Sequence, residues 1–124
     1  VYVKGDYEML TTALRNLVEN AIVYSDSGAQ VGVGIKRVGN LAEISVADSG
    51  RGISEDEQER IFERFYRVDP SRSRETGGTG LGLSIVKHAA QNHNGEVKLF
   101  SRLGVGSTFT LRIPAIDKEI GVEA

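Results

Sequence analysis

The sequence contains no cysteine, and that absence excludes several kinds of chemistry at once. A chain without cysteine has no disulfide framework, no thiolate nucleophile and no thiolate metal site, which is typical of a reducing compartment. No apolar run approaches the roughly 20 residues that span a bilayer, and no signal-peptide pattern opens the chain. The formal net charge is only −2, which indicates neither a nucleic-acid footprint nor a basic membrane patch. We expect a soluble domain with no nucleic-acid partner and no membrane contact of its own.

The length of 124 residues is that of one ordinary domain, which buries about two thirds of its unfolded surface. We therefore predict a single domain over residues 1–124. The opening Val1-Tyr2-Val3 already reads as a strand, so we expect this domain to be one part of a longer protein.

The first half of the chain alternates between helical and strand periodicity. An apolar stripe with three- and four-residue steps follows a cap at Gly5-Asp6 and predicts a helix to about Tyr24; its members are Leu10, Leu14, Leu17 and Ala21. Two-residue alternation then predicts strands around residues 31–35 and 42–46, joined by a turn at Gly39-Asn40.

The second half adds two helices, a long polar loop and a hairpin. Ser54 with Glu57 has the spacing of a capping box for a helix over Glu55–Phe65. The polar segment between Tyr66 and Thr79 is longer than most connections, which favours a lid. A helix over 81–94 and strands on both sides of the 102–106 turn complete the order. The pattern predicts an α/β fold: a two-layer α/β sandwich with three helices on one face of a mostly antiparallel sheet.

A glycine-rich loop precedes the third predicted helix and has the composition of a phosphate cradle. It contains Gly77, Gly78, Gly80 and Gly82. Such a backbone can approach a ligand closely, and the helix after it would present unpaired N–H groups to an anion. A P-loop is excluded because Leu83 stands where lysine is required, and a dinucleotide fingerprint is excluded because Leu83 also replaces its third glycine. The alternative is a flexible linker that caps the helix.

Asn16 and Asn20 are four residues apart, so they share one face of the first predicted helix, with Tyr24 one turn further. Side-chain amide oxygens suit Mg²⁺, which keeps several waters and relies on substrate phosphates for other ligands. The alternative is that both asparagines bond to neighbouring loops.

Asp48 ends the second predicted strand on the same face as Ala42, Ile44 and Val46. It could cap the glycine turn that follows. It could also accept a hydrogen bond from an amine-bearing ring packed against Ile53 and the glycines.

Arginines and histidines offer further candidates. Five arginines lie between Arg60 and Arg74, interleaved with aromatic residues. Arginines beside a phosphate site neutralise charge in phosphoryl transfer, although most residues in such a run form a solvated face. No acidic residue follows His88 or His93, and we interpret them as an ordinary helix-face residue and a helix-end residue.

Five motifs in order resemble the catalytic ATP-binding domain of bacterial two-component sensor histidine kinases, and they cover essentially the whole chain. The wider superfamily also holds gyrase, a mismatch-repair ATPase, a heat-shock chaperone and mitochondrial dehydrogenase kinases. The motifs resemble the N box, first glycine box, F box, second glycine box and last glycine box, at residues 16–21, 48–52, 61–67, 78–83 and 104–109.

The resemblance implies the Bergerat ATP-binding fold, with ATP and Mg²⁺ as ligands. It implies that Asn20 ligates Mg²⁺ with help from Asn16, that Asp48 holds the adenine amine, and that Arg67 reaches the γ-phosphate. Thr108 is expected behind the aspartate. The remaining nucleotide contacts it implies are Tyr24, Gly50, Gly52, Ile53, Gly78, Thr79, Gly80, Leu81, Gly82 and Leu83.

The resemblance also implies partners that this chain lacks. The γ-phosphoryl group would pass to a histidine on a separate dimerisation domain and then, indirectly, to a response regulator. Neither that domain nor a sensor domain is present, so we expect a monomer that does not autophosphorylate alone. The expected location is cytoplasmic, with the parent protein anchored in the bacterial membrane.

One departure keeps other functions open. Many relatives carry a basic residue where this chain has Val23, so phosphate binding must come from Arg67, Lys87 or the lid. An ATP-sensing module without kinase activity is therefore one alternative, and a serine-directed kinase of the anti-sigma type is another. A gyrase-like hydrolase is disfavoured because Asn16 stands where that branch has its general base, and an amide cannot take the proton.

Overall fold

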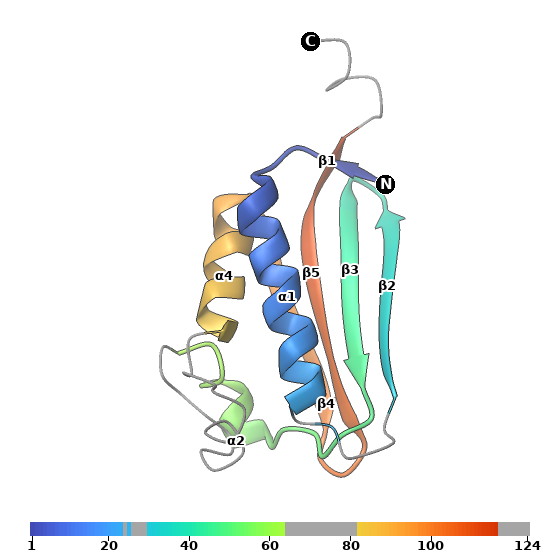
Figure 1. Ribbon diagram of the computed structural model, residues 1–124, viewed down its shortest axis with the longest axis vertical. Coiled ribbons are helices and arrows are strands. Elements are labelled where there is room, and N and C mark those ends of the chain that lie inside the picture. Colours follow the sequence, from blue (N-terminus) through green and yellow to red (C-terminus); the bar gives the residue numbers. More distant parts are fainter. Residues whose placement is uncertain (24, 26–29, 64–81, 117–124) are drawn as a thin grey trace.

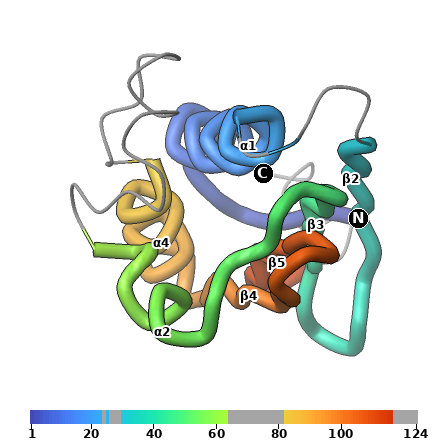
Figure 2. Tube along the Cα trace, turned by 90° about the horizontal axis from the view of Figure 1, so that it is seen from below, coloured from blue at the N-terminus to red at the C-terminus, as the bar shows by residue number. Residues whose placement is uncertain are grey.

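The computed structural model describes residues 1–23, 25, 30–63 and 82–116. Its helices and strands form two layers, a curved sheet and a helical layer on one face of it (Figures 1 and 2). The fold class predicted from the sequence, a two-layer α/β sandwich, is confirmed. The elements are β1 (Tyr2–Val3), α1 (Tyr7–Val23), β2 (Val31–Val38), β3 (Leu41–Asp48), α2 (Glu55–Gln58), α4 (Gly82–Asn92), β4 (Glu96–Arg102) and β5 (Gly106–Ile116).

The sheet is organised around β5, which pairs with β1, β3 and β4. Strand β2 then pairs with β3 and forms an edge. Every pairing between these described strands is antiparallel. The register of β3 on β5 sets Asp48 opposite Ser107 and Val46 opposite Phe109, so all four side chains share one face.

Helix α1 begins at the predicted cap. The Oδ1 atom of Asp6 accepts a hydrogen bond from the backbone N–H of Met9 at 2.9 Å, which satisfies one of the unpaired donors of the first turn. The stripe of α1 that faces inward includes Ala13, Leu17 and Ala21, which are buried. Its small residues let α1 pack closely against α4, whose buried side chains are Val86, Ala89 and Ala90.

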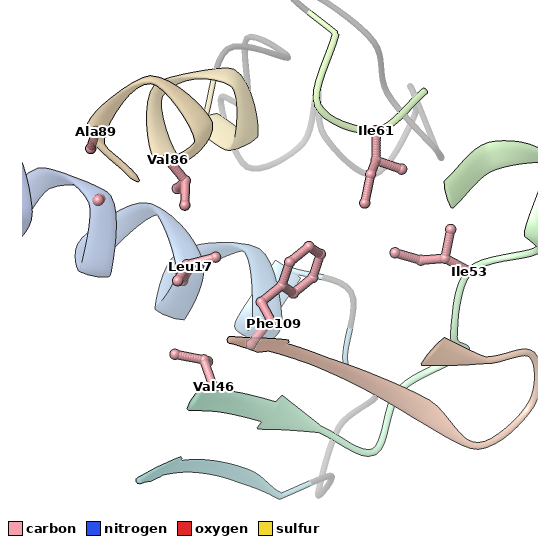
Figure 3. Close-up of a cluster of buried hydrophobic side chains, with 9 residues drawn as sticks. Leu17, Val46, Ile53, Ile61, Val86, Ala89 and Phe109 are labelled. Atoms are coloured by element: carbon pink, nitrogen blue, oxygen red, sulfur yellow. The ribbon is translucent and has the colours of Figure 1, made fainter. Parts of the chain in front are cut away.

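Phe109 links the two layers of the core. It is 2% exposed, and α1, β3 and β5 contribute to the same cluster. Figure 3 shows Phe109 between Leu17 on one side and the pair Ile53 and Ile61 on the other. The Phe62 ring meets it edge to face, with centroids 6.1 Å apart and an interplanar angle of 85°. Phe62 is partly buried and packs against the same cluster.

Helix α4 is closed by a turn at Asn94 and Gly95. Asn94 has a φ of 58°, the left-handed conformation that closes many helices. The backbone N–H of Gly95 donates to the Ala90 carbonyl at 2.8 Å. Regular helix stops at Asn92, two residues before the predicted end, because these capping bonds replace the last helical ones.

Helix α2 differs from its prediction. It ends at Gln58 rather than Phe65, and turns follow it to Ile61 and Phe62. After Gln58 the Glu57 carbonyl accepts bonds from both the Arg60 and the Ile61 N–H, and the Glu63 N–H donates to the Arg60 carbonyl, so three-residue bonds appear after one helical turn. The predicted capping box is also incomplete. The Ser54 hydroxyl contacts the Glu57 carboxylate at 3.4 Å and makes no cap bond to the backbone.

No helix in the described part of the chain is long and apolar enough to cross a membrane.

Replacing Gly95 by alanine tests the turn between α4 and β4. A Cβ at this position would collide with the backbone carbonyl of Arg112, so we expect Gly95→Ala to lower the free energy of unfolding by about 1–3 kcal/mol. Urea denaturation measures the change. The matched control is Gly32→Ala in β2, where no heavy atom lies within 4 Å of the new methyl and stability should hold or rise slightly. Equal stabilities of the two variants would contradict the tight turn.

Candidate functional site

Four segments converge at one end of the molecule, the lower end in Figure 1. They are the last turns of α1, the end of β3, the start of α4, and the turn over residues 49–54 that leads into α2. Segments far apart in sequence therefore meet in one region. They carry Asn16 and Asn20 of the N box, and Asp48, Gly50 and Gly52 of the first glycine box. This region is the candidate site.

The asparagine pair borders the start of α4. Asn16 and Asn20 are both half-buried on α1, one turn apart. The Nδ2 group of Asn16 donates to the Thr12 carbonyl at 3.0 Å. Its Oδ1 atom lies 3.1 Å from the point that a Cβ on Gly82 would occupy. A methyl group on residue 82 would therefore be tighter than ordinary van der Waals contact, and the Asn16 side chain would have to shift by a few tenths of an ångström.

Asp48 is held by backbone donors on both sides. Its Oδ1 accepts a hydrogen bond from the Gly50 N–H at 2.9 Å, so the interpretation as a turn cap is confirmed. The backbone of Ser107 also donates to the carboxylate. Burial raises the pKa of Asp48 above its ordinary 3.8, while the bonds from Gly50 and Ser107 act in the opposite direction. An ionised carboxylate has about four acceptor sites, and these two bonds fix its orientation.

The turn after Asp48 is pressed against the β4–β5 hairpin. A Cβ on Gly52 would collide with the backbone of Arg102, and one on Gly106 would collide with the backbone of Asp48. Gly52 also has a φ of 75°, which disfavours any other residue. The N–H of Gly104 donates to the Arg51 carbonyl at 2.7 Å. The glycines thus serve close backbone contact here, and Gly50 and Gly52 are both buried.

The structure corrects the position predicted for Thr108. This residue pairs with Ala47 on β3 and lies on the face of the sheet away from Asp48. Ser107 is the residue opposite Asp48, and it is 5% exposed. The sequence carried a signal for this, because Ser107 has the same two-residue parity as the apolar residues Phe109, Leu111 and Ile113.

Ile53 connects the site to the core. It is 9% exposed and belongs to the same cluster as Phe109 and Ile61. A nucleobase-sized ring placed beside Asp48 would therefore have an apolar neighbour that is itself anchored. Leu83, the second residue of α4, also packs against this cluster.

Several predicted site residues lie outside the described residues, so they stay predictions. These are Tyr24, Arg67, Gly78, Thr79, Gly80 and Leu81, together with the whole predicted lid.

The described arrangement combines three chemical capacities. Asp48 offers an oriented carboxylate to an amine. The N-terminus of α4 offers the positive end of a helix dipole to an anion. Asn16 and Asn20, half-buried on α1, offer amide oxygens. Such a site fits a ligand with an amine-bearing ring at one end and phosphates at the other.

A family model described as "Histidine kinase-, DNA gyrase B-, and HSP90-like ATPase" matches residues 5–117. The chain is 59% identical over 112 residues to the sensor-like histidine kinase SenX3 of Mycolicibacterium smegmatis, a match that covers 90% of this chain and 29% of that protein. It is 41% identical over 116 residues to the sensor histidine kinase WalK of Bacillus subtilis, covering 92% of this chain and 19% of that one. The chain thus spans less than a third of these relatives.

Solved structures agree with the sequence matches. The mycobacterial sensor histidine kinase MprB has a TM-score of 0.79 at 32% identity, covering 91% of this chain and 74% of that one. The catalytic domain of the histidine kinase ThkA has a TM-score of 0.78 at 30% identity, covering 91% and 70%.

The raised pKa of Asp48 predicts a pH dependence of stability. The folded chain binds this proton more tightly than the unfolded chain, so Asp48 contributes stability at low pH that is lost as pH rises through the window between 3.8 and the folded-state pKa. We expect an NMR titration of the carboxyl carbon to give a midpoint above 3.8. The free energy of unfolding of Asp48→Asn should lack this pH-dependent contribution. A midpoint below 3.8 would contradict the dominance of burial over the two hydrogen bonds.

Proposed function

The chain belongs to the histidine kinase-, DNA gyrase B- and HSP90-like ATPase family, and from this we propose that it is the catalytic domain of a sensor histidine kinase. In this proposal it binds ATP with Mg²⁺ and transfers the γ-phosphoryl group to a histidine on the dimerisation domain of the same kinase. A response regulator would be the indirect partner in two-component signalling.

The observation that carries the proposal is the oriented carboxylate of Asp48 near the buried side chain of Ile53. An exocyclic amine on a purine is a donor that such a carboxylate orients well. Ile53 is buried next to the turn, and Gly50 and Gly52 present backbone without side chains. These features support binding of the adenine ring at this edge of the sheet.

The metal would lie nearer the asparagines. Asn20 would supply an amide oxygen to Mg²⁺, and Asn16 would assist from the neighbouring turn of α1. Bound Mg²⁺ would neutralise phosphate charge and orient the γ-phosphoryl group. The half-buried position of both amides and the closeness of the Asn16 oxygen to Gly82 fit this role.

The phosphates would lie at the N-terminus of α4, where Gly82 begins the helix. The predicted contacts of the second glycine box and the γ-phosphate contact of Arg67 complete this part of the proposal. Lys87 is exposed on α4 and is a further candidate for the missing basic residue at Val23.

The contacts of the two histidines support an external acceptor. The Nε2 atom of His93 accepts a hydrogen bond from the Asp6 N–H at 2.9 Å, and its Nδ1 contacts the Ala89 carbonyl at 2.7 Å. Both ring nitrogens are thereby engaged, at the end of the molecule opposite the candidate site. His88 contacts Asn92 at 3.2 Å on the exposed surface of α4.

Nucleotide binding can be measured by titration calorimetry with a non-hydrolysable ATP analogue. We expect a dissociation constant in the micromolar range that weakens when Mg²⁺ is removed. Asp48→Asn should weaken binding by about 10- to 100-fold, because it replaces a charged acceptor with an amide. Asp6→Asn is the matched control, since asparagine caps a helix as well as aspartate does. A folded native chain that binds no ATP would contradict the active-kinase proposal.

Phosphotransfer can be tested by mixing the chain with labelled ATP. The chain alone should acquire no phosphohistidine. Acid-labile, alkali-stable label should appear only when a histidine-bearing dimerisation domain of the same kinase is added, and a histidine-to-glutamine version of that domain should stay unlabelled. Steady release of inorganic phosphate without labelling would instead favour the ATPase alternative.

A further inference from the structure

The Ser101 hydroxyl in β4 is a junction between the turn after Asp48 and the strand that carries Ser107. It accepts a hydrogen bond from the Ile53 N–H at 2.8 Å. It donates to the Gly106 carbonyl at 3.1 Å and lies 2.8 Å from the Ser107 hydroxyl. One side chain thus binds three residues that are 5, 6 and 48 positions away.

These three contacts use the whole hydrogen-bonding capacity of Ser101. A serine hydroxyl has one proton and two lone pairs. Its proton goes to Gly106, so its lone pairs receive the Ile53 N–H and the Ser107 O–H. Because Ser107 is 5% exposed and Ile53 is 9% exposed, removal of the hydroxyl would leave buried donors without this partner.

The backbone of Ile53 is held from a second side as well. Its carbonyl accepts a hydrogen bond from the Gln58 side-chain amide at 2.8 Å, and the same amide lies 3.4 Å from the Ser101 carbonyl. Side chains from β4 and α2 therefore fix both polar groups of one turn residue. Ser107 in turn donates its backbone N–H to Asp48. Ser101 is therefore connected to the Asp48 carboxylate through Ser107, and also through Ile53 and the turn that contains Gly50.

We propose that Ser101 is a positioning residue for the nucleotide. Its hydroxyl fixes the turn over residues 50–53 relative to Ser107, and these two segments fix the carboxylate of Asp48 and the apolar surface of Ile53 for an adenine ring. This inference rests on the proposed function, since it assigns how the adenine end of that site is held before the nucleotide arrives. Ser101 acts through these residues and need not touch the ligand.

The first readout is local and needs no ligand. In Ser101→Ala the Ile53 amide loses its acceptor, so we expect its hydrogen exchange, followed by NMR, to accelerate about tenfold or more. Ser101→Thr keeps a hydroxyl and should retain most of the protection. Calorimetry with the non-hydrolysable ATP analogue is the second readout, where Ser101→Ala should lose about tenfold in affinity and Ser101→Thr should recover it.

A matched control separates positioning from a general loss of stability. Ser45 forms a hydroxyl pair with Thr110 at 3.1 Å, part-buried on the other face of the same sheet. Ser45→Ala therefore removes a comparable hydroxyl from the face of the sheet opposite Asp48 and Ser107. It should change the thermal midpoint by a similar amount while ATP affinity and Ile53 exchange stay native.

The outcomes distinguish the inference from the proposed function. A native chain that binds ATP while Ser101→Ala binds equally well would overturn the role of Ser101 alone. Failure of the folded native chain to bind ATP would overturn both. If Ser101→Ala does not fold, Gln58→Met serves the same purpose, because it removes the bond to the Ile53 carbonyl at similar side-chain volume. Native ATP affinity in Gln58→Met would then count against positioning of the turn.

Discussion

Close backbone contact between the turn after Asp48 and the β4–β5 hairpin is the constraint on which the site depends. Gly52 and Gly106 approach carbonyl groups of the opposite segment with no space for a Cβ, and the Gly104 N–H closes the contact on Arg51. This approach brings the Ser107 backbone to the carboxylate of Asp48. The glycines of these two motifs are therefore required by packing of the protein against itself, as well as by any ligand.

The hydrophobic core extends this constraint to the helical layer. Phe109 follows Ser107 by two residues on β5 and contacts the cluster that contains Leu17, Ile53 and Ile61. The same strand therefore carries the partner of Asp48 and the centre of the core. Burial of this cluster aligns α1, with its two asparagines, against the end of β3. A shift of one strand position would move both Ser107 and Phe109 to the wrong face.

Much of this site was predictable because its chemistry lies in short motifs. The spacing of Asn16 and Asn20 and the inward position of Asp48 on its strand were each readable from a few neighbouring residues. The structure differs from the sequence prediction where contacts with a distant segment determine the local conformation. Helix α2 is one turn long because its end is drawn into contacts with Ile53, Ser101 and the core. The resemblance placed Thr108 behind Asp48, but the register of β5 on β3 sets Ser107 opposite the aspartate.

The sequence by itself determined the elements, the two-layer fold and the family, since periodicity, turn residues and motif spacing are local properties of the chain. Tertiary structure alone decided which side chain holds the turn after Asp48. Ser101 and Ile53 are 48 residues apart, and no local pattern relates them. Their contact follows from antiparallel register and from core packing, which are set only when the whole sheet has formed.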